Sequence, residues 1–197
     1  GEGLAGAGGH LDERTGAVVA LKILIDRSES AMDRFSRESK VLQQLDHPGI
    51  VKYVAHGQTI DGDAWLAMEW LEGEDLAARL ERSGMRVSES LALAARLAGA
   101  LGASHELGIV HRDIKPSNVF LPGGRLHDAK LLDFGIARAL GAKTALTRTG
   151  TIMGTPGYMA PEQFEGQSAI DARADVFSLG ALLFECLTGK PAFAGEH

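Results

Sequence analysis

His111-Arg112-Asp113-Ile114-Lys115-Pro116-Ser117-Asn118 is the most informative stretch of this chain of 197 residues. It contains the only asparagine of the sequence. Asp113 is a carboxylate that can accept the proton of a hydroxyl group. Lys115, two residues later, can neutralise negative charge that develops on a reacting group. The stretch therefore predicts a loop that carries a base and a cation close together.

A second motif, Asp133-Phe134-Gly135, follows shortly afterwards. Asn118 and Asp133 offer hard oxygen ligands, which suit Mg²⁺. A base, a cation and two metal ligands are the set that transfer of a phosphoryl group from ATP to a hydroxyl requires. Taken singly, Asp113 is equally well a turn residue, Asn118 a cap, and the second motif an ordinary turn. Their occurrence together and in this order favours the catalytic interpretation.

The region before these motifs is expected to contain short strands around one helix. Residues 18–24 are β-branched and apolar, which indicates a strand with Ala20 and Lys22 on one face. Apolar residues recur at helical spacing from 28 to 45, and Glu38 lies within that apolar face. A carboxylate there is costly unless it is paired, so we expect an ion pair with Lys22. Alternatively, both are separate solvated charges.

The remaining elements follow from periodicity and from turn residues. Strands are expected at residues 51–57 and 64–70, and a polar break at 72–75 is the candidate boundary between two parts. Helices are expected at 88–107 and 171–188. The fold class is therefore α+β. The segment from 136 to 155 has little periodicity, and a loop of that length in a compact domain is usually functional.

Bulk composition excludes several classes of protein. The net charge of −6 and a pI of about 5.6 argue against broad affinity for nucleic acid. The single cysteine, Cys186, cannot form an intrachain disulfide, which fits a reducing, cytoplasmic location. The seven histidines show no metal-site spacing, and no apolar run reaches the length of a membrane span. We expect the chain to be part of a longer protein, which could carry a membrane anchor elsewhere.

These motifs resemble, over nearly the whole chain, those of the bacterial branch of the eukaryotic-type serine/threonine protein kinases. The resemblance implies a two-lobed kinase fold, with a mostly β N-lobe at residues 1–71 and a mostly α C-lobe at 72–197. Relative to the family, both ends look truncated: the first strand is cut short and the helices after residue 188 are missing. The apolar helix at 171–188 would then be left partly uncovered, so we expect the isolated chain to be poorly soluble or inactive.

The resemblance also implies an ATP site. Asp113 would be the base, Lys115 the contact to the γ-phosphate, and Asn118 and Asp133 the ligands of Mg²⁺, with Mn²⁺ as an alternative ion. Lys22 would hold the α- and β-phosphates with Glu38 as its partner. The other residues that would contact ATP are the glycine-rich loop residues Gly1, Gly3 and Gly6, together with Ala20, Met68, Glu69 and Leu71, the last two through their backbone, and, at the ribose, Asp75.

Regulation and substrate follow from the same resemblance. Arg112 marks kinases that are switched on by phosphorylation of the loop before the Ala160-Pro161-Glu162 segment, because an arginine can pair with a phosphate and order that loop. Thr147 and Thr149 are the expected acceptors, phosphorylated in trans within a transient kinase–kinase dimer. The partners would be proteins with Ser or Thr acceptors. Three further residues are expected to have structural roles in the loop and its supports: His111, Glu162 and Asp175.

One departure from the family concerns ATP. The valine that normally packs on adenine after the third loop glycine is Gly8 here. Losing that contact costs on the order of 1.5–3 kcal/mol, so weak ATP binding is expected. A pseudokinase or regulatory binding module is therefore the alternative function, although Lys22, Asp113 and Asp133 are all present. A small-molecule phosphotransferase is disfavoured by Lys115 and by the segment at 160–162, which in the family serve a peptide substrate.

Overall fold

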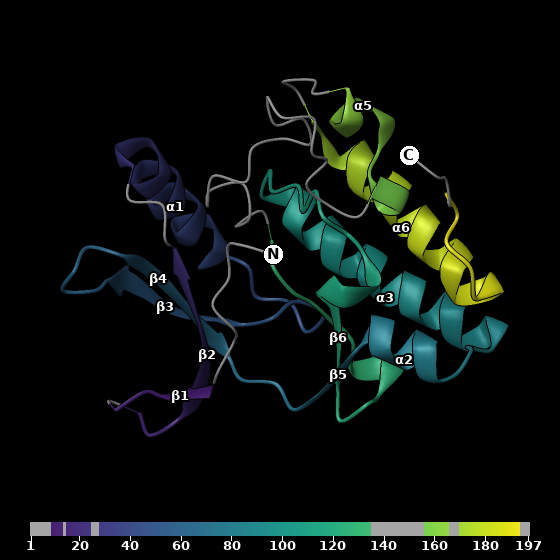
Figure 1. Cartoon of the computed structure of the whole chain (residues 1–197), viewed down its shortest axis with the longest axis horizontal. Helices are drawn as coiled ribbons and strands as arrows, with labels where there is room; N and C mark the ends of the chain where they lie inside the picture. The colour runs from purple at the N-terminus through teal and green to yellow at the C-terminus, as the bar shows by residue number, and fades with distance from the viewer. Residues whose placement is uncertain (1–8, 14, 25–27, 135–155, 166–169, 194–197) are drawn as a thin grey trace.

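The structure is a computed structural model, and it describes residues 9–13, 15–24, 28–134, 156–165 and 170–193. An antiparallel sheet with one helix forms the first part of the chain, and a mostly helical part with a small second sheet follows it (Figure 1). The expected α+β class is confirmed. None of the helices in these ranges is both long and apolar enough to cross a membrane.

The first sheet has four strands in the order β1-β2-β4-β3, and every neighbouring pair is antiparallel. The expected strands at 18–24, 51–57 and 64–70 are present with small shifts of their ends. The register places Ala20 opposite Met68 and Lys22 opposite Leu66. The bounds of these strands are β1 Gly9–Leu11, β2 Val18–Leu24, β3 Tyr53–Gln58 and β4 Ala64–Glu69.

Helix α1 (Glu29–Leu42) packs on this sheet through Phe35, which is buried with Leu66 and Met68. The expected helix ran to residue 45. The chain instead leaves the helix through tight turns, in which the N–H of Leu45 donates to Leu42 O at 3.1 Å. Leu45 is buried nonetheless, in the core of the other part. The apolar spacing of α1 therefore continues to Leu45, beyond the end of the helix, because the turn after the helix packs into the larger core.

The polar break predicted at 72–75 is wrong in part, because Gly73–Asp75 forms strand β5. β5 pairs with β6 (Val119–Pro122), which pairs in turn with β7 (Lys130–Leu131). The φ of Gly73 is +150°, and a Cβ at this position would lie 2.2 Å from Leu121 O. Only glycine fits so close to the partner strand. The strand was missed because its partner lies far away in the sequence.

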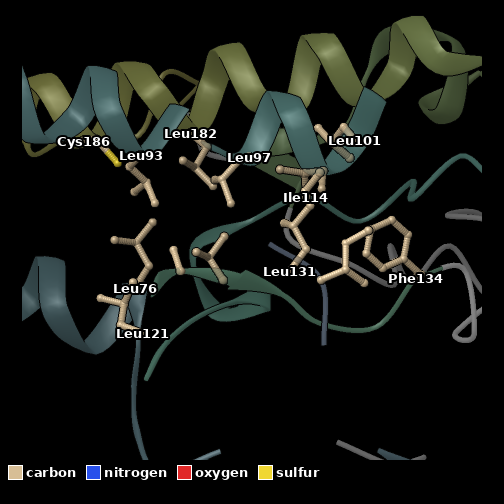
Figure 2. Packing of buried hydrophobic residues seen from close by; sticks show 14 of the residues in the cluster. Leu76, Leu93, Leu97, Leu101, Ile114, Leu121, Leu131, Phe134, Leu182 and Cys186 are labelled. Atoms are coloured by element: carbon tan, nitrogen blue, oxygen red, sulfur yellow. The ribbon is translucent and has the colours of Figure 1, made fainter. Parts of the chain in front are cut away.

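Three helices line the larger hydrophobic core together with β6 and β7, and all three lie in the second part of the chain (Figure 1). They are α2 (Leu76–Arg82), α3 (Val87–Glu106) and α6 (Ala172–Thr188). Figure 2 shows α3 and α6 lying along each other, with leucines below them that come from α2 and the second sheet. The labelled core residues of that view are Leu76, Leu93, Leu97, Leu101, Ile114, Leu121, Leu131, Phe134, Leu182 and Cys186.

The ends of α3 and α6 follow the predicted signals, which confirms both helices. The carboxylate of Asp171 caps α6 by accepting from Arg173 N at 2.9 Å, and Gly189 closes it with φ +69°. Gly108, with φ +73°, follows the end of α3. Helix α2 was not expected, because it is a single short segment that starts at the capping carboxylate of Asp75.

Helix α6 carries apolar side chains that stay at the surface: Val176, Phe184 and Leu187 are 64%, 46% and 42% exposed. The poor solubility expected of the isolated chain stays a prediction. Short helical elements complete the second part of the chain: η1 (Pro116–Asn118), η2 (Leu126–Asp128), η3 (Pro156–Tyr158) and α5 (Pro161–Phe164).

Candidate active site

Two distant segments meet at an ion pair between Lys22 and Asp133, which are 111 residues apart in the sequence. Lys22 lies on β2, and Asp133 follows β7. Both side chains are mostly buried, with 16% and 23% of their surface exposed. The convergence of these two segments, on which the sequence argument depended, is thus present in the fold.

The loop between α3 and β6 gathers the polar groups around Asp113. Lys115 Nζ donates to Asp113 Oδ2 at 2.8 Å, and Asn118 Nδ2 donates to the same oxygen at 2.8 Å and to Asp113 O at 2.7 Å. Asn118 is 7% exposed, whereas the side chain of Asp113 is 40% exposed. The Asp113 carboxylate therefore accepts from two side-chain donors, Lys115 and Asn118, and remains accessible to an acceptor hydroxyl that approaches from the solvent side.

Asp175, on α6, is fully buried and fixes the start of this loop. Its carboxylate accepts from the backbone N–H of His111 at 2.8 Å and of Arg112 at 2.7 Å. His105 Nε2 donates to the same carboxylate at 2.7 Å. A buried carboxylate is tolerated only when donors satisfy it, and these three do so. The position of Asp113 is thereby tied to the central helix of the core.

His111 connects the loop to the segment that leads to Asp133. Its Nε2 donates to Leu132 O at 2.7 Å, and its Nδ1 accepts the N–H of Asp113 at 3.3 Å. Burial lowers the pKa of His111, against the opposing effect of the Asp175 carboxylate. A neutral ring with the proton on Nε2 satisfies both bonds. Both ring nitrogens of His111 are therefore occupied by bonds that link the loop to the segment before Asp133.

Two residues other than glycine have positive φ in the described ranges, and both lie at this site. They are Arg112, with φ +67°, and Asp133, with φ +62°. Such a conformation costs of order 1–3 kcal/mol and persists only where the surroundings enforce it. For Arg112, the enforcing bonds are those to Asp175 and the one from Gln163 Nε2 to Arg112 O, at 2.9 Å. Strain concentrated at these two positions is typical of a functional site.

Comparison with known proteins supplies the family. The model of the protein kinase domain matches residues 1–197. The chain belongs to the protein kinase domain family. Its relatives include the serine/threonine-protein kinases Pkn2 of Myxococcus xanthus, 39% identical, and PkaA of Streptomyces coelicolor, 42% identical. The alignments cover 91% and 97% of this chain but 22% and 36% of those proteins, so the chain spans about a third or less of their length.

A solved structure agrees with this assignment. The crystal structure of Rad53 1–466 in complex with AMP-PNP superimposes with a TM-score of 0.72 at 29% sequence identity. The match covers 93% of this chain and 44% of that one. The protein-kinase fold expected from the sequence is therefore confirmed, and membership of the family implies that the domain binds ATP.

The kinase residues expected near adenine lie on adjacent strands of the first sheet. Ala20 and Met68 are directly opposite each other on β2 and β4. Glu69 ends β4, and Leu71 follows it in the connection to the second part of the chain. Asp75 Oδ1 accepts from Ala78 N at 2.8 Å, so one oxygen of the expected ribose contact already caps α2. The roles of these residues toward ATP stay predictions.

The residues expected to hold Mg²⁺ fit that ion chemically. The amide nitrogen of Asn118 is bound to Asp113, which leaves its amide oxygen as the atom that can face a cation. Asp133 adds a carboxylate, and Mg²⁺ completes its shell with phosphate oxygens and water. Among the described residues, no three or more His, Cys, Asp and Glu gather into a metal site. A kinase-type site, in which the nucleotide supplies further ligands, needs no such cluster.

Several predicted residues lie outside what the structure describes. These include the loop glycines Gly1, Gly3 and Gly6 and the expected phosphorylation sites Thr147 and Thr149. Glu38 is in α1, but its side chain is not described, so its pairing with Lys22 stays a prediction. Glu162 is in α5.

Sequence reasoning missed contacts that have no motif of their own. Gln163 Nε2 holds Arg112 O, and His105 shares Asp175 with the loop. Lys130, three residues before Asp133, forms an ion pair with the side chain of Glu69, for which only a backbone role had been expected. These partners lie 51, 70 and 61 residues apart in the sequence, so no local spacing points to them.

Proposed function

We propose that this protein is a serine/threonine protein kinase, which transfers the γ-phosphate of ATP to Ser or Thr hydroxyls of protein substrates. The observation that carries the proposal is the accessible Asp113 carboxylate, bound by Lys115 and Asn118 in a loop that Asp175 fixes. Lysine at position 115 resembles the serine/threonine branch of the family. Residues 1–71 and 72–197 are proposed as its two lobes.

The geometry suggests how the chain's own groups divide the work. Asp113 orients the acceptor hydroxyl and receives its proton as the hydroxyl oxygen bonds to the γ-phosphorus and the bond between that phosphorus and the ADP leaving group breaks. Lys115 lies beside Asp113 Oδ2 and neutralises negative charge on the transferred phosphoryl group. Lys22 holds its ammonium at Asp133 and can pair with the phosphates of the donor. Mg²⁺, or Mn²⁺ in its place, supplies charge neutralisation between the phosphates when it is bound at Asn118 and Asp133.

The test is transfer of γ-labelled phosphate to a mixture of Ser-, Thr- and Tyr-containing peptides by the full-length protein. We expect label on Ser and Thr, dependence on a divalent cation, and loss of transfer in the Asp113→Asn variant. Label on tyrosine only, or label in the variant equal to that in the wild type, would contradict the proposal.

The pseudokinase alternative finds no support in the described residues. It depended on Gly8, which lies outside them. The lost valine contact still predicts weak nucleotide binding, and Gly8→Val should tighten the Kd for ATP about tenfold or more, since a valine contact with adenine adds roughly 1.5–3 kcal/mol. Isothermal titration with an ATP analogue measures the effect.

Gly9→Val is the matched control for that substitution. A Cβ at Gly9 would lie 2.9 Å from Val18 Cγ1, so a side chain at this position requires the Val18 side chain or β1 to shift. We expect Gly9→Val to give no gain in affinity. If the unmodified protein already binds ATP with ordinary micromolar affinity, the concern about Gly8 is unfounded.

We propose that loop phosphorylation regulates the enzyme. Arg112 lies in the loop that carries Asp113. A phosphate paired with Arg112 would therefore couple the loop before residues 160–162 to the base. Thr147 and Thr149 are the proposed acceptors, modified in trans by a transient second copy.

The cytoplasmic location expected from the sequence stays a prediction, as does the absence of nucleic-acid partners.

After incubation with ATP, phosphopeptide mapping is expected to find phosphate on one or both of these threonines. Activity should fall about tenfold or more in the double Thr→Ala variant, because each pairing of a phosphate with an arginine adds charge-assisted hydrogen bonds that order a loop. A map without phosphate between Thr144 and Thr151 would end this proposal.

A further inference from the structure

A second ion pair links the two parts of the chain at a place that the proposed chemistry does not use. Lys130, on β7, donates to Glu69 Oε1 at the end of β4. The two side chains are 19% and 27% exposed, so solvent screens this pair less than it screens a surface pair. The same Oε1 accepts the backbone N–H of Lys52 at 2.7 Å. One carboxylate oxygen therefore joins three segments.

The register relates this pair to the ion pair of the active site. Lys22 lies opposite Leu66 on β4, and Glu69 is three residues further along that strand. On the other side, Lys130 is three residues before Asp133. The two ion pairs, Lys22–Asp133 and Glu69–Lys130, are thus offset by three residues along β4, or about 10 Å at the rise of a strand, and by three residues along the segment from Lys130 to Asp133. Together they connect the first sheet to the β7 segment at two points.

Backbone bonds hold β7 against the first part of the chain beside the Glu69–Lys130 pair. Leu131 N donates to Gly49 O at 2.8 Å, and Val51 N donates to Leu131 O at 3.0 Å. Glu69 N donates to Lys52 O at 2.9 Å. Of these contacts, only the Glu69–Lys130 pair runs directly from the end of β4 to β7. The pair therefore adds a direct link between these two strands to the backbone bonds that connect them through residues 49–52.

We propose that Glu69 and Lys130 are positioning residues for ATP, an inference that rests on the proposed kinase function. The segment from Glu69 to Leu71 would bind adenine, and Asp133 would bind the phosphate end through its metal. An extended nucleotide must meet both ends at once. The Glu69–Lys130 pair sets their separation, so that binding at one end places the other correctly.

A merely structural ion pair is the competing explanation. Arg125 and Asp128 provide a comparison, since they form a more exposed pair, 61% and 35%, within a short turn of the second part. Pairs of that kind contribute little to stability. Arg125→Gln removes one cation and one ion pair without touching either strand, and it serves as the matched control for Lys130→Met.

The experiment measures steady-state kinetics and nucleotide binding for the full-length protein. We expect Lys130→Met to raise the KM and the Kd for ATP about tenfold, with kcat changed less than threefold, because a small misplacement of one end weakens simultaneous contact at both. Adenosine occupies only the adenine end, so its Kd should change less than twofold. Lys130→Arg should restore the affinity for ATP, and Glu69→Gln combined with Lys130→Met should be no worse than either alone.

The outcomes separate this inference from the proposed function. Inactive wild-type protein would overturn the kinase proposal and the inference together, whereas normal kinetics in Lys130→Met would overturn the inference alone. Equal weakening of adenosine and ATP would also overturn it, since the pair would then shape only the adenine end. A loss that appears in kcat, follows a lower melting temperature and is not repaired by Lys130→Arg would leave the pair a purely structural contact.

Discussion

Replacement of Asp113 by asparagine is expected to lower kcat for phosphoryl transfer by about 10²–10⁴-fold, the usual contribution of a general base. Asparagine has the size of aspartate and can still accept from Lys115, but it cannot take up the proton of the acceptor hydroxyl. The Kd for ATP should change less than about threefold, because Asp113 faces the acceptor rather than the nucleotide. Single-turnover transfer to a threonine peptide, together with titration of an ATP analogue, measures both quantities.

Asp128→Asn is the control for this substitution. It makes the same chemical change at an exposed aspartate, which pairs with Arg125 away from the loop. Its rate should stay within about twofold of the wild type, as expected for a surface ion pair. If Asp113→Asn keeps more than about a tenth of the wild-type rate, the carboxylate is not the base, since even a modest general base contributes about 10²-fold.

The parts of the fold that local sequence specifies could be predicted. Helix α6 is bounded by a capping carboxylate at Asp171 and by a glycine at 189 that adopts the left-handed conformation. The alternation in β2 likewise predicted that Ala20 and Lys22 share a face. Strand β5 and helix α2 were missed because both are short, and β5 exists only through pairing with β6. Pairing between distant segments leaves no periodic pattern in either of them.

The candidate site shows the same limit. The residues of the loop from His111 to Asn118 could be predicted as a group because their chemistry lies within one short stretch. That Lys22 meets Asp133 could be expected only because both belong to recognised motifs. Lys130 belongs to no motif, the side chain of Glu69 had no expected role, and charged residues at strand ends are usually solvated. Their pairing therefore became visible only when the strands were placed side by side.

Replacement of Asp175 by alanine is expected to have the largest effect on stability. The change leaves the backbone N–H groups of His111 and Arg112 buried without their acceptor and removes the partner of His105. Each unsatisfied buried donor costs about 1–3 kcal/mol, so the total loss should be roughly 3–5 kcal/mol. The carboxylate also lies in the first turn of α6, where the helix dipole favours negative charge. Urea unfolding measures the total.

Amide hydrogen exchange at His111 and Arg112 tests the local part of this prediction, because protection there reports whether the loop is still held. Asp171→Asn is the matched control on the same helix. Asparagine caps as well as aspartate, and the exposed pair with Arg173 contributes little, so a loss below about 1 kcal/mol is expected. If Asp175→Ala is destabilised no more than this control, the loop is fixed by other contacts, such as the bond from Gln163 to Arg112 O. Activity should fall together with protection, since the strained backbone at Arg112 positions Asp113 only while Asp175 enforces it.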